Sequence, residues 1–204
     1  MATSRHLVLT LLLGTACATS RHAGTRAADG LALVAGDGTA TTIHDRCQGR
    51  DATVLVFWSA SCPCVRRYQQ RIDALLDDYP AARVCVLGVS SNAGDQLTDV
   101  LRVADQRGVR IPILRDEGGR VADALGVRST PTVVVLDAAG EVRYLGWIDN
   151  ERLPGEPGRE AWLERALHGV LERRDAFAHR SPTYGCAITR SLLGSQSSPC
   201  CSIH

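Results

Sequence analysis

The amino-acid sequence predicts an α/β protein in which a mixed β-sheet is flanked by helices. Two uninterrupted apolar runs, Val54–Trp58 and Val84–Val89, have the pattern of strands that are buried on both faces of a sheet. Apolar residues at helical spacing follow each run. Two short apolar segments, Val133–Leu136 and Val142–Leu145, then predict a hairpin. Strands that alternate with helices and end in a hairpin are typical of a mixed sheet.

Size and composition are those of one folded domain. The chain has 204 residues, of which 45% are apolar and 22% charged, as in most globular proteins. Setting aside an N-terminal leader and a C-terminal tail leaves about 150 residues, which suits a single domain. The net charge of +1 gives little electrostatic attraction for nucleic acid. The sequence contains no lysine, which excludes catalysis by a lysine nucleophile.

Residues 1–18 predict a secretory signal peptide. They combine a positively charged start, the apolar segment Leu7–Leu13 and the small residues Ala16-Cys17-Ala18 where a signal peptidase would cleave. The apolar segment is too short to span a bilayer. Cys17 also fits the cysteine of a bacterial lipoprotein signal, although Gly14 stands where that signal has leucine, so lipidation at Cys17 is an alternative. We expect an exported, periplasmic or extracellular protein, where disulfides persist.

A polar linker at 19–30 precedes the predicted domain, which covers 31–175, and an irregular C-terminal tail follows at 176–204. Turn-forming residues define the first hairpin, and Pro80 ends the first helix. The expected elements, in order, are a hairpin of Leu31–Val34 and Thr41–His44, a strand at Val54–Trp58, a helix at Val65–Leu76, a strand at Val84–Val89, a helix at Leu97–Val103, an extended segment at Ile111–Leu114, the hairpin of Val133–Leu136 and Val142–Leu145, and a helix at Ala161–Leu171.

Cys62 has the clearest chemical signature. It lies between the strand that ends near Trp58 and the helix that follows Pro63. A cysteine at a helix N-terminus faces the positive end of the helix dipole, which favours the thiolate and lowers the thiol pKa. We therefore expect Cys62 to be a nucleophile, with a buried inert cysteine as the alternative.

Pro131 is the second notable residue. It follows Thr130 and opens the apolar strand that begins near Val133. A proline that starts a strand after a polar residue is where a cis peptide bond is expected. We predict a cis bond between Thr130 and Pro131.

Together these features resemble the thioredoxin fold and, within it, the extracytoplasmic TlpA-like and peroxiredoxin-like redoxins. The resemblance runs from about Leu31 to Leu171 and is carried by Phe57-Trp58 before Cys62, by Thr130-Pro131, and by the hairpin that follows. It implies that Cys62 is the attacking cysteine. It also implies that Pro131 is the cis-proline facing Cys62, beside a groove in which an extended substrate strand pairs with the backbone. No cofactor is implied, and the expected partners are protein thiols or disulfides and a redox partner protein.

The motif departs from thioredoxin in its spacing. Only Pro63 separates Cys62 from Cys64, and Val65 occupies the place of the second thioredoxin cysteine. A disulfide across one residue closes a small ring and should be easily reduced. Val56 stands where thioredoxin has a buried aspartate, so no general base is identified. We expect a thiol-disulfide oxidoreductase that acts through Cys62, with Cys64 as the resolving thiol and Cys186 as the alternative resolving thiol.

Two alternatives stay open. The first is a peroxiredoxin-like thiol peroxidase in which Cys62 is oxidised by peroxide and the distal Cys186 resolves it. Ser59 fits the peroxiredoxin pattern, whereas Leu55 replaces its proline. The second is a non-enzymatic module that binds Cu(I) through Cys62 and Cys64, although no histidine or methionine lies close to them in sequence.

The other cysteines have weaker signals. Cys85 lies within an apolar strand and is expected to be a small buried hydrophobe. Cys47 lies between Arg46 and Gln48 in a polar turn, and it could either pair with another cysteine or remain a free thiol. Cys200 and Cys201, with His204, are residue types that can coordinate a metal ion. Adjacent cysteines near a terminus are, however, often disordered or oxidised, so we predict no metal site there.

Overall fold

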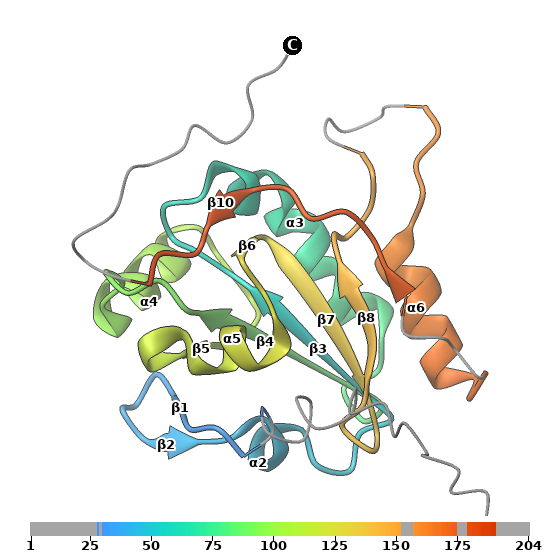
Figure 1. Cartoon of the computed structure of the whole chain (residues 1–204), viewed down its shortest axis with the longest axis horizontal. Helices are drawn as coiled ribbons and strands as arrows, with labels where there is room; N and C mark the ends of the chain where they lie inside the picture. The colour runs from blue at the N-terminus through green and yellow to red at the C-terminus, as the bar shows by residue number, and fades with distance from the viewer. Residues whose placement is uncertain (1–27, 29, 152–156, 175–178, 191–204) are drawn as a thin grey trace, which may run out of the picture.

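The computed structural model describes residue 28 and residues 30–151, 157–174 and 179–190. They form an eight-stranded sheet in the order β2-β1-β5-β4-β3-β7-β8-β9 (Figure 1). At its centre β3 (Ala52–Phe57) is parallel to β4 (Val84–Ser90) and antiparallel to β7 (Thr132–Asp137). The expected mixed sheet is therefore confirmed.

Shorter strands extend the sheet on both sides. On one side β5 (Ile113–Arg115) is parallel to β4, and the hairpin of β1 (Leu33–Val34) and β2 (Ala40–Thr41) lies beyond it. On the other side β8 (Val142–Gly146) forms the expected hairpin with β7. The central strands are thus covered on both edges as well as on both faces.

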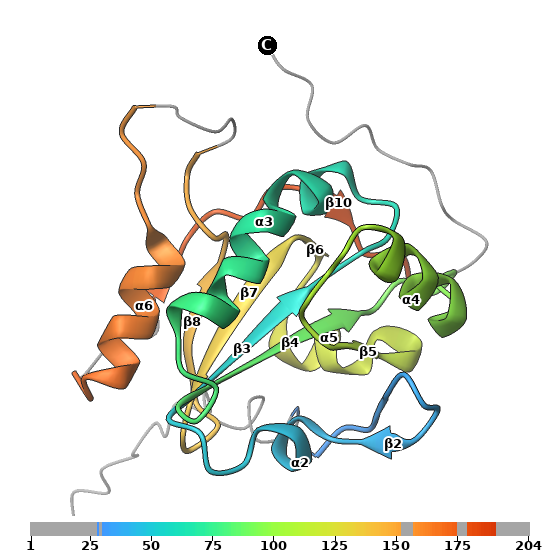
Figure 2. The ribbon, with the colours of Figure 1, turned by 180° about the vertical axis from the view of Figure 1, so that it is seen from behind.

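Helices cover both faces of the sheet, as the two opposite views in Figures 1 and 2 show. Val54 and Val56 of β3 pack with α3 (Pro63–Asp78) and α6 (Trp162–Leu171), whereas Leu55 and Phe57 pack with α2 (Ile43–Cys47) and α5 (Arg120–Leu125). Because successive side chains of a strand point to opposite faces, burial on both faces requires an uninterrupted apolar run. This explains the sequence of β3.

A third apolar cluster fills the end of the sheet where β3 stops. It brings α4 (Leu97–Gln106) against the start of α3, with Val100 and Ala104 packed beside Val65. Cys62 and Cys64 belong to this cluster, so both thiols lie in a well-packed part of the molecule.

The N-terminal hairpin is shorter than the sequence predicts. The expected strand Thr41–His44 ends at Thr41, because α2 begins at Ile43. The Asp45 amide donates to the Thr42 hydroxyl at 3.1 Å, and the Thr42 amide donates to the Asp45 carboxylate at 3.0 Å. This capping box satisfies two amides that would otherwise lack partners at the helix start, and so favours a helix over a longer strand.

A disulfide links Cys47 of α2 to Cys85 of β4. The prediction that Cys85 is only a buried hydrophobe is therefore wrong, and Cys47 is its partner. Cys85 pairs with Thr53 near the start of β3, whereas Cys62 follows the end of β3. The disulfide and Cys62 thus lie at opposite ends of the sheet.

Two elements between β5 and β7 are not predicted by the sequence. They are η1 (Glu117–Gly119) and α5, which together span nine residues. The Asp116 carboxylate accepts hydrogen bonds from the amides of Val121 and Ala122, both at 3.0 Å, and so caps α5. A six-residue helix is too short to produce a clear apolar period.

The C-terminal arm, defined here as residues 179–190, is largely irregular but packs along the domain. β9 (His179–Arg180) is parallel to β8, and β10 (Cys186–Ala187) is antiparallel to β6 (Ser129–Thr130). In Figure 1 the arm runs from beside α6 across the ends of β8 and β7 toward α4. This part of the predicted tail thus lies against the same end of the sheet as the start of α3.

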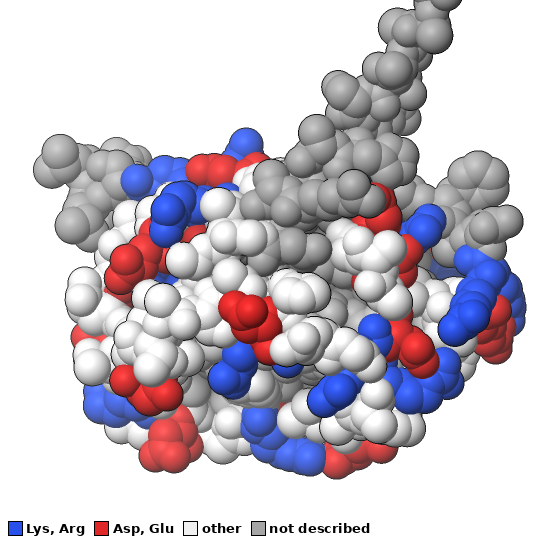
Figure 3. Space-filling view, turned by 90° about the horizontal axis from the view of Figure 1, so that it is seen from below, with Lys and Arg blue, Asp and Glu red and all other residues white. Residues whose placement is uncertain are grey.

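The predicted signal peptide, including Cys17, lies outside the described residues, as do Cys200, Cys201 and His204. None of the described helices has the length and apolar character needed to cross a membrane. On the described part of the face shown in Figure 3, acidic and basic side chains are interspersed. This agrees with the nearly balanced charge of the sequence.

Candidate redox site

Cys62 lies where the sequence places it, at the end of the loop that joins β3 to α3. It is the N-cap residue of α3, and Pro63 is the first residue of the helix. Proline suits this position because its missing N–H would have no partner in the first turn. The Cys62 side chain is 1% exposed. The fold therefore presents the sulfur at a helix N-terminus, in a site from which water is largely excluded.

The Thr130–Pro131 segment faces Cys62. The peptide bond between these residues is cis, which confirms the prediction. The Cys62 thiol donates a hydrogen bond to the carbonyl oxygen of Thr130, 3.1 Å away. Two segments separated by 68 residues in the sequence thus meet at the Cys62 sulfur.

The surroundings of Cys62 lower the pKa of its thiol. Burial alone raises it, because a charged thiolate loses solvation. Hydrogen bonds from the side chains of Cys186 and Thr130, and from the backbone of Val65 and Cys186, outweigh burial and lower the pKa. Since the thiolate is the nucleophile in disulfide exchange, this environment favours reactivity.

Thr130 contributes through its side chain as well as its carbonyl group. The residue is 2% exposed, and its hydroxyl oxygen has no partner of regular hydrogen-bond geometry within the described part of the chain. A buried hydroxyl without another partner is available to donate to a thiolate. The sequence analysis used Thr130 only to locate the cis-proline and did not assign its hydroxyl a role.

Cys186 lies in direct contact with Cys62. It is opposite Thr130 in the β6–β10 pair, and its side chain forms a hydrogen bond with the Cys62 thiol. Cys186 also packs against the apolar cluster that contains Cys62 and Cys64. The two thiols are 124 positions apart in the sequence but share one site.

Cys64 occupies a different position. It is the second residue of α3 and is 1% exposed, packed in the cluster that includes Val65 and Val100. In the structure Cys62 and Cys64 are not joined by a disulfide.

A polar network connects the loop before Cys62 to the arm. The Asn92 side chain donates to the Ser59 hydroxyl at 3.0 Å, and its oxygen accepts the amide of Thr189 at 3.0 Å. Asn92 and Ser59 are both at least nine-tenths buried. Sequence reasoning did not identify Asn92, which lies in the loop after β4 and carries no motif.

The structure therefore brings together Cys62, Pro131 and Cys186 and places Cys64 beside them. Val56, at the position of the thioredoxin aspartate, is fully buried among apolar side chains of α3 and α6. Across the described ranges no three His, Cys, Asp or Glu side chains are grouped so that they could hold a metal ion.

Comparisons with known proteins agree with this description. Residues 23–145 match the model of the AhpC/TSA family. A curated relative, the thiol-disulfide oxidoreductase ResA of Halalkalibacterium halodurans, is 34% identical over 88 residues, which are 43% of this chain and 49% of the relative. The chain thus spans about half the length of this relative.

Solved structures support the fold. An uncharacterized conserved protein from Geobacillus kaustophilus has a TM-score of 0.69 and 28% identity, and the match covers 79% of this chain and 89% of that one. A thioredoxin-like protein from Aeropyrum pernix has a TM-score of 0.52 and 19% identity, covering 72% and 91% of the two chains. The chain has a thioredoxin-like fold.

Proposed function

The chain belongs to the AhpC/TSA family, and from that premise we propose that it is a thiol-disulfide oxidoreductase whose nucleophile is Cys62. The observation that carries the proposal is the position of the Cys62 sulfur, at the N-terminus of α3 and 3.1 Å from the carbonyl of Thr130, with a lowered pKa. Similarity to ResA, a thiol-disulfide oxidoreductase, supports the same activity.

The reaction begins with the Cys62 thiolate attacking one sulfur of a substrate disulfide. A bond forms between Cys62 and that sulfur, the substrate S–S bond breaks, and the second substrate sulfur leaves as a thiolate that takes a proton from water. A second thiol of the protein then attacks Cys62 and releases the first substrate sulfur. The protein loses two electrons and the substrate gains them. Run in reverse, the same steps oxidise a dithiol.

Two protein thiols are candidates for the second attack. Cys64 is close in sequence, whereas the side chain of Cys186 contacts Cys62. The substrates we propose are protein disulfides, with a redox partner protein that restores the starting state. We also propose that the chain works outside the cytoplasm, because its N-terminus has the composition of a signal peptide and because disulfides such as Cys47–Cys85 persist there.

Replacement of Cys62 tests the proposal. We expect Cys62→Ser to abolish reduction of insulin disulfides, because serine cannot form the mixed disulfide. Cys85→Ala is a suitable comparison, since it removes a cysteine at the opposite end of the sheet and should retain the activity. Peroxide consumption measured in parallel distinguishes the peroxidase alternative. Unchanged insulin reduction by Cys62→Ser would exclude Cys62 as the nucleophile.

A further inference from the structure

The C-terminal arm occupies the position that an extended substrate strand would take. A thioredoxin-like site offers the backbone before its cis-proline to an incoming strand. Here β10 already pairs with β6, so that Cys186 is opposite Thr130 and Ala187 opposite Ser129. The Ile188 amide also donates to the carbonyl of Arg128 at 2.9 Å. The arm thus binds the same edge as a substrate, with a cysteine at the reactive position.

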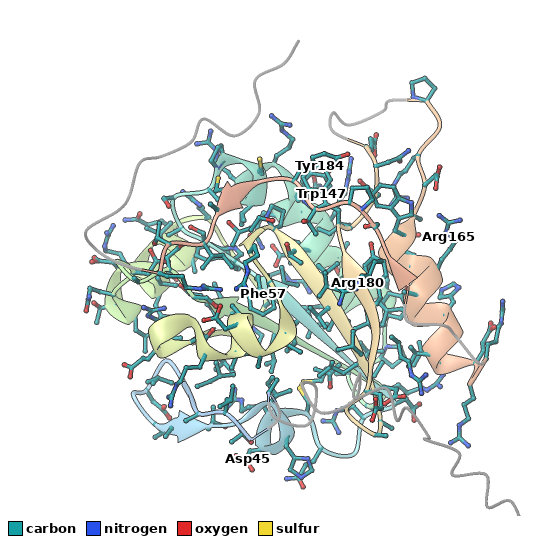
Figure 4. All side chains as sticks on the ribbon, in the orientation of Figure 1. Asp45, Phe57, Trp147, Arg165, Arg180 and Tyr184 are labelled. Atoms are coloured by element: carbon teal, nitrogen blue, oxygen red, sulfur yellow. A yellow bond between two sulfur atoms is a disulfide. The ribbon has the colours of Figure 1, made fainter. Side chains whose placement is uncertain are left out.

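Specific contacts hold the arm on both sides of Cys186. On one side the Tyr184 ring packs against Trp147, with centroids 4.9 Å apart (Figure 4). On the other side Ile188 is buried in the apolar cluster that contains Leu55 and Phe57 of β3 and side chains of α5. Arg190 donates to the Asp123 carboxylate at 3.1 Å and to the carbonyl of Val127 at 3.1 Å. These contacts lie on separate elements, so they fix the register of the arm as well as its position.

Gly185 allows the arm to approach the backbone of Thr130 closely. Its φ is +130°, a conformation that residues with a side chain rarely adopt. A Cβ atom at this position would lie 2.0 Å from the carbonyl oxygen of Thr130. Only glycine can therefore occupy the position next to Cys186 while β10 stays paired with β6.

We propose that the arm is a tethered strand that competes with substrate for the β6 edge and that its Cys186 is the thiol that resolves the mixed disulfide on Cys62. The proposal rests on the function proposed above. The arm must leave the edge for a substrate strand to bind, which exposes the Cys62 sulfur. Its return displaces the substrate strand and brings Cys186 back to Cys62.

When the arm returns, attack of Cys186 on the mixed disulfide needs no further oxidant or reductant. The Cys186 thiol loses its proton to water and its sulfur attacks Cys62 of the mixed disulfide. The Cys62–Cys186 bond forms, the bond from Cys62 to the substrate breaks, and the substrate sulfur leaves as a thiolate. The electron pair that Cys186 donates is the pair that the substrate carries away. Strand displacement and disulfide formation thus release the product together.

The first test opens the arm without changing a cysteine. In Gly185→Ala the added methyl group and the positive φ oppose docking of the arm. Alkylation by iodoacetamide is measured at a pH above the ordinary thiol pKa, where Cys62 is ionised with or without the hydrogen bonds from Cys186, and we expect it to become about tenfold faster. Gly38→Ala is the matched control, because Gly38 also has a positive φ, +82°, but no atom would lie within 4 Å of its Cβ. Equal alkylation rates in Gly185→Ala and Gly38→Ala would overturn the tethered-strand proposal.

The second test identifies the resolving thiol. Each reduced protein is mixed with oxidised glutathione, quenched with acid and mapped by peptide mass spectrometry. We expect the glutathione adduct on Cys62 to accumulate several-fold in Cys186→Ser, but to stay at the wild-type level in Cys64→Ser. Accumulation in Cys64→Ser alone would overturn the assignment of Cys186 while preserving the proposed function. A Cys62 that forms no adduct or disulfide in any variant would overturn the proposed function itself.

Discussion

Some of the groups around Cys62 raise the pKa of its thiol and others lower it. The Thr130 carbonyl accepts the thiol hydrogen and favours the protonated form, as burial also does. The side chains of Cys186 and Thr130 and the amide end of α3 favour the thiolate, and together they lower the pKa. A buried sulfur can therefore be reactive, because the protein replaces the water that stabilises a thiolate in solution.

The Thr130 hydroxyl gives a prediction at the residue scale. Because the pKa of Cys62 is lowered, the thiolate is present above that pKa and is lost as the pH falls through it. Thr130→Val removes a donor while preserving the shape of the side chain, so we expect alkylation of Cys62 to require a higher pH. A hydrogen bond to a charged group contributes about 1.5 kcal/mol or more, so alkylation at low pH should slow about tenfold.

The rate of Cys62 alkylation as a function of pH measures this effect. Thr53→Val is the control, because Thr53 is also a buried threonine but lies near the start of β3, away from Cys62. If the pH profile of Thr130→Val coincides with that of the wild type, the hydroxyl does not stabilise the thiolate.

Single residues also mark the limit of what the sequence reveals. Cys62 and Pro131 could be identified because each lies at the junction of two predictable elements. The role of Cys186 could be considered only as an alternative, because nothing local indicates that Gly185 brings its strand against Thr130. That contact depends on the whole arm being docked.

At the scale of elements, the Cys47–Cys85 disulfide ties a short helix to a central strand. α2 has only five residues, fewer than an isolated helix needs to be stable in water. Its position depends on its cap, on the burial of Ile43 and on the bond to β4. We assign this disulfide a structural role, because it lies at the opposite end of the sheet from Cys62.

Removal of this disulfide should change stability but leave the reactivity of Cys62 intact. The two cysteines are 38 positions apart, and the chain-entropy model gives a loop of this length about 4 kcal/mol of stabilisation. We expect Cys47→Ala/Cys85→Ala to lower the free energy of unfolding in urea by up to that amount. Equal free energies of unfolding for the oxidised wild type and the double variant would contradict the structural role.

The predictable elements are those with long apolar patterns. The central strands β3, β4 and β7 and the helices α3, α4 and α6 follow from runs and helical spacing. By contrast, α2 and α5 depend on caps provided by Thr42 and Asp116 rather than on periodicity. β6 and β10 are two residues each and pair only with one another, so no pattern within either segment predicts them.

At the scale of the whole molecule, the groups of the proposed redox site lie at one end of the sheet. The start of α3, the cis-proline segment and the arm converge there from three distant parts of the chain (Figure 1). The opposite end contains the Cys47–Cys85 disulfide. The thioredoxin-like scaffold thus separates the Cys47–Cys85 disulfide from the Cys62 thiol, and in our proposal its own C-terminal arm competes with substrate for the β6 edge.

The most direct test of this account is a disulfide map of the oxidised wild-type protein. The fully reduced protein would receive two equivalents of oxidised glutathione, enough to form two disulfides, and the reaction would be quenched with acid before digestion and peptide mass spectrometry. We predict a Cys62–Cys186 disulfide, with Cys47–Cys85 as a separate bond. A Cys62–Cys64 disulfide, or Cys62 recovered as an unmodified thiol, would contradict the account.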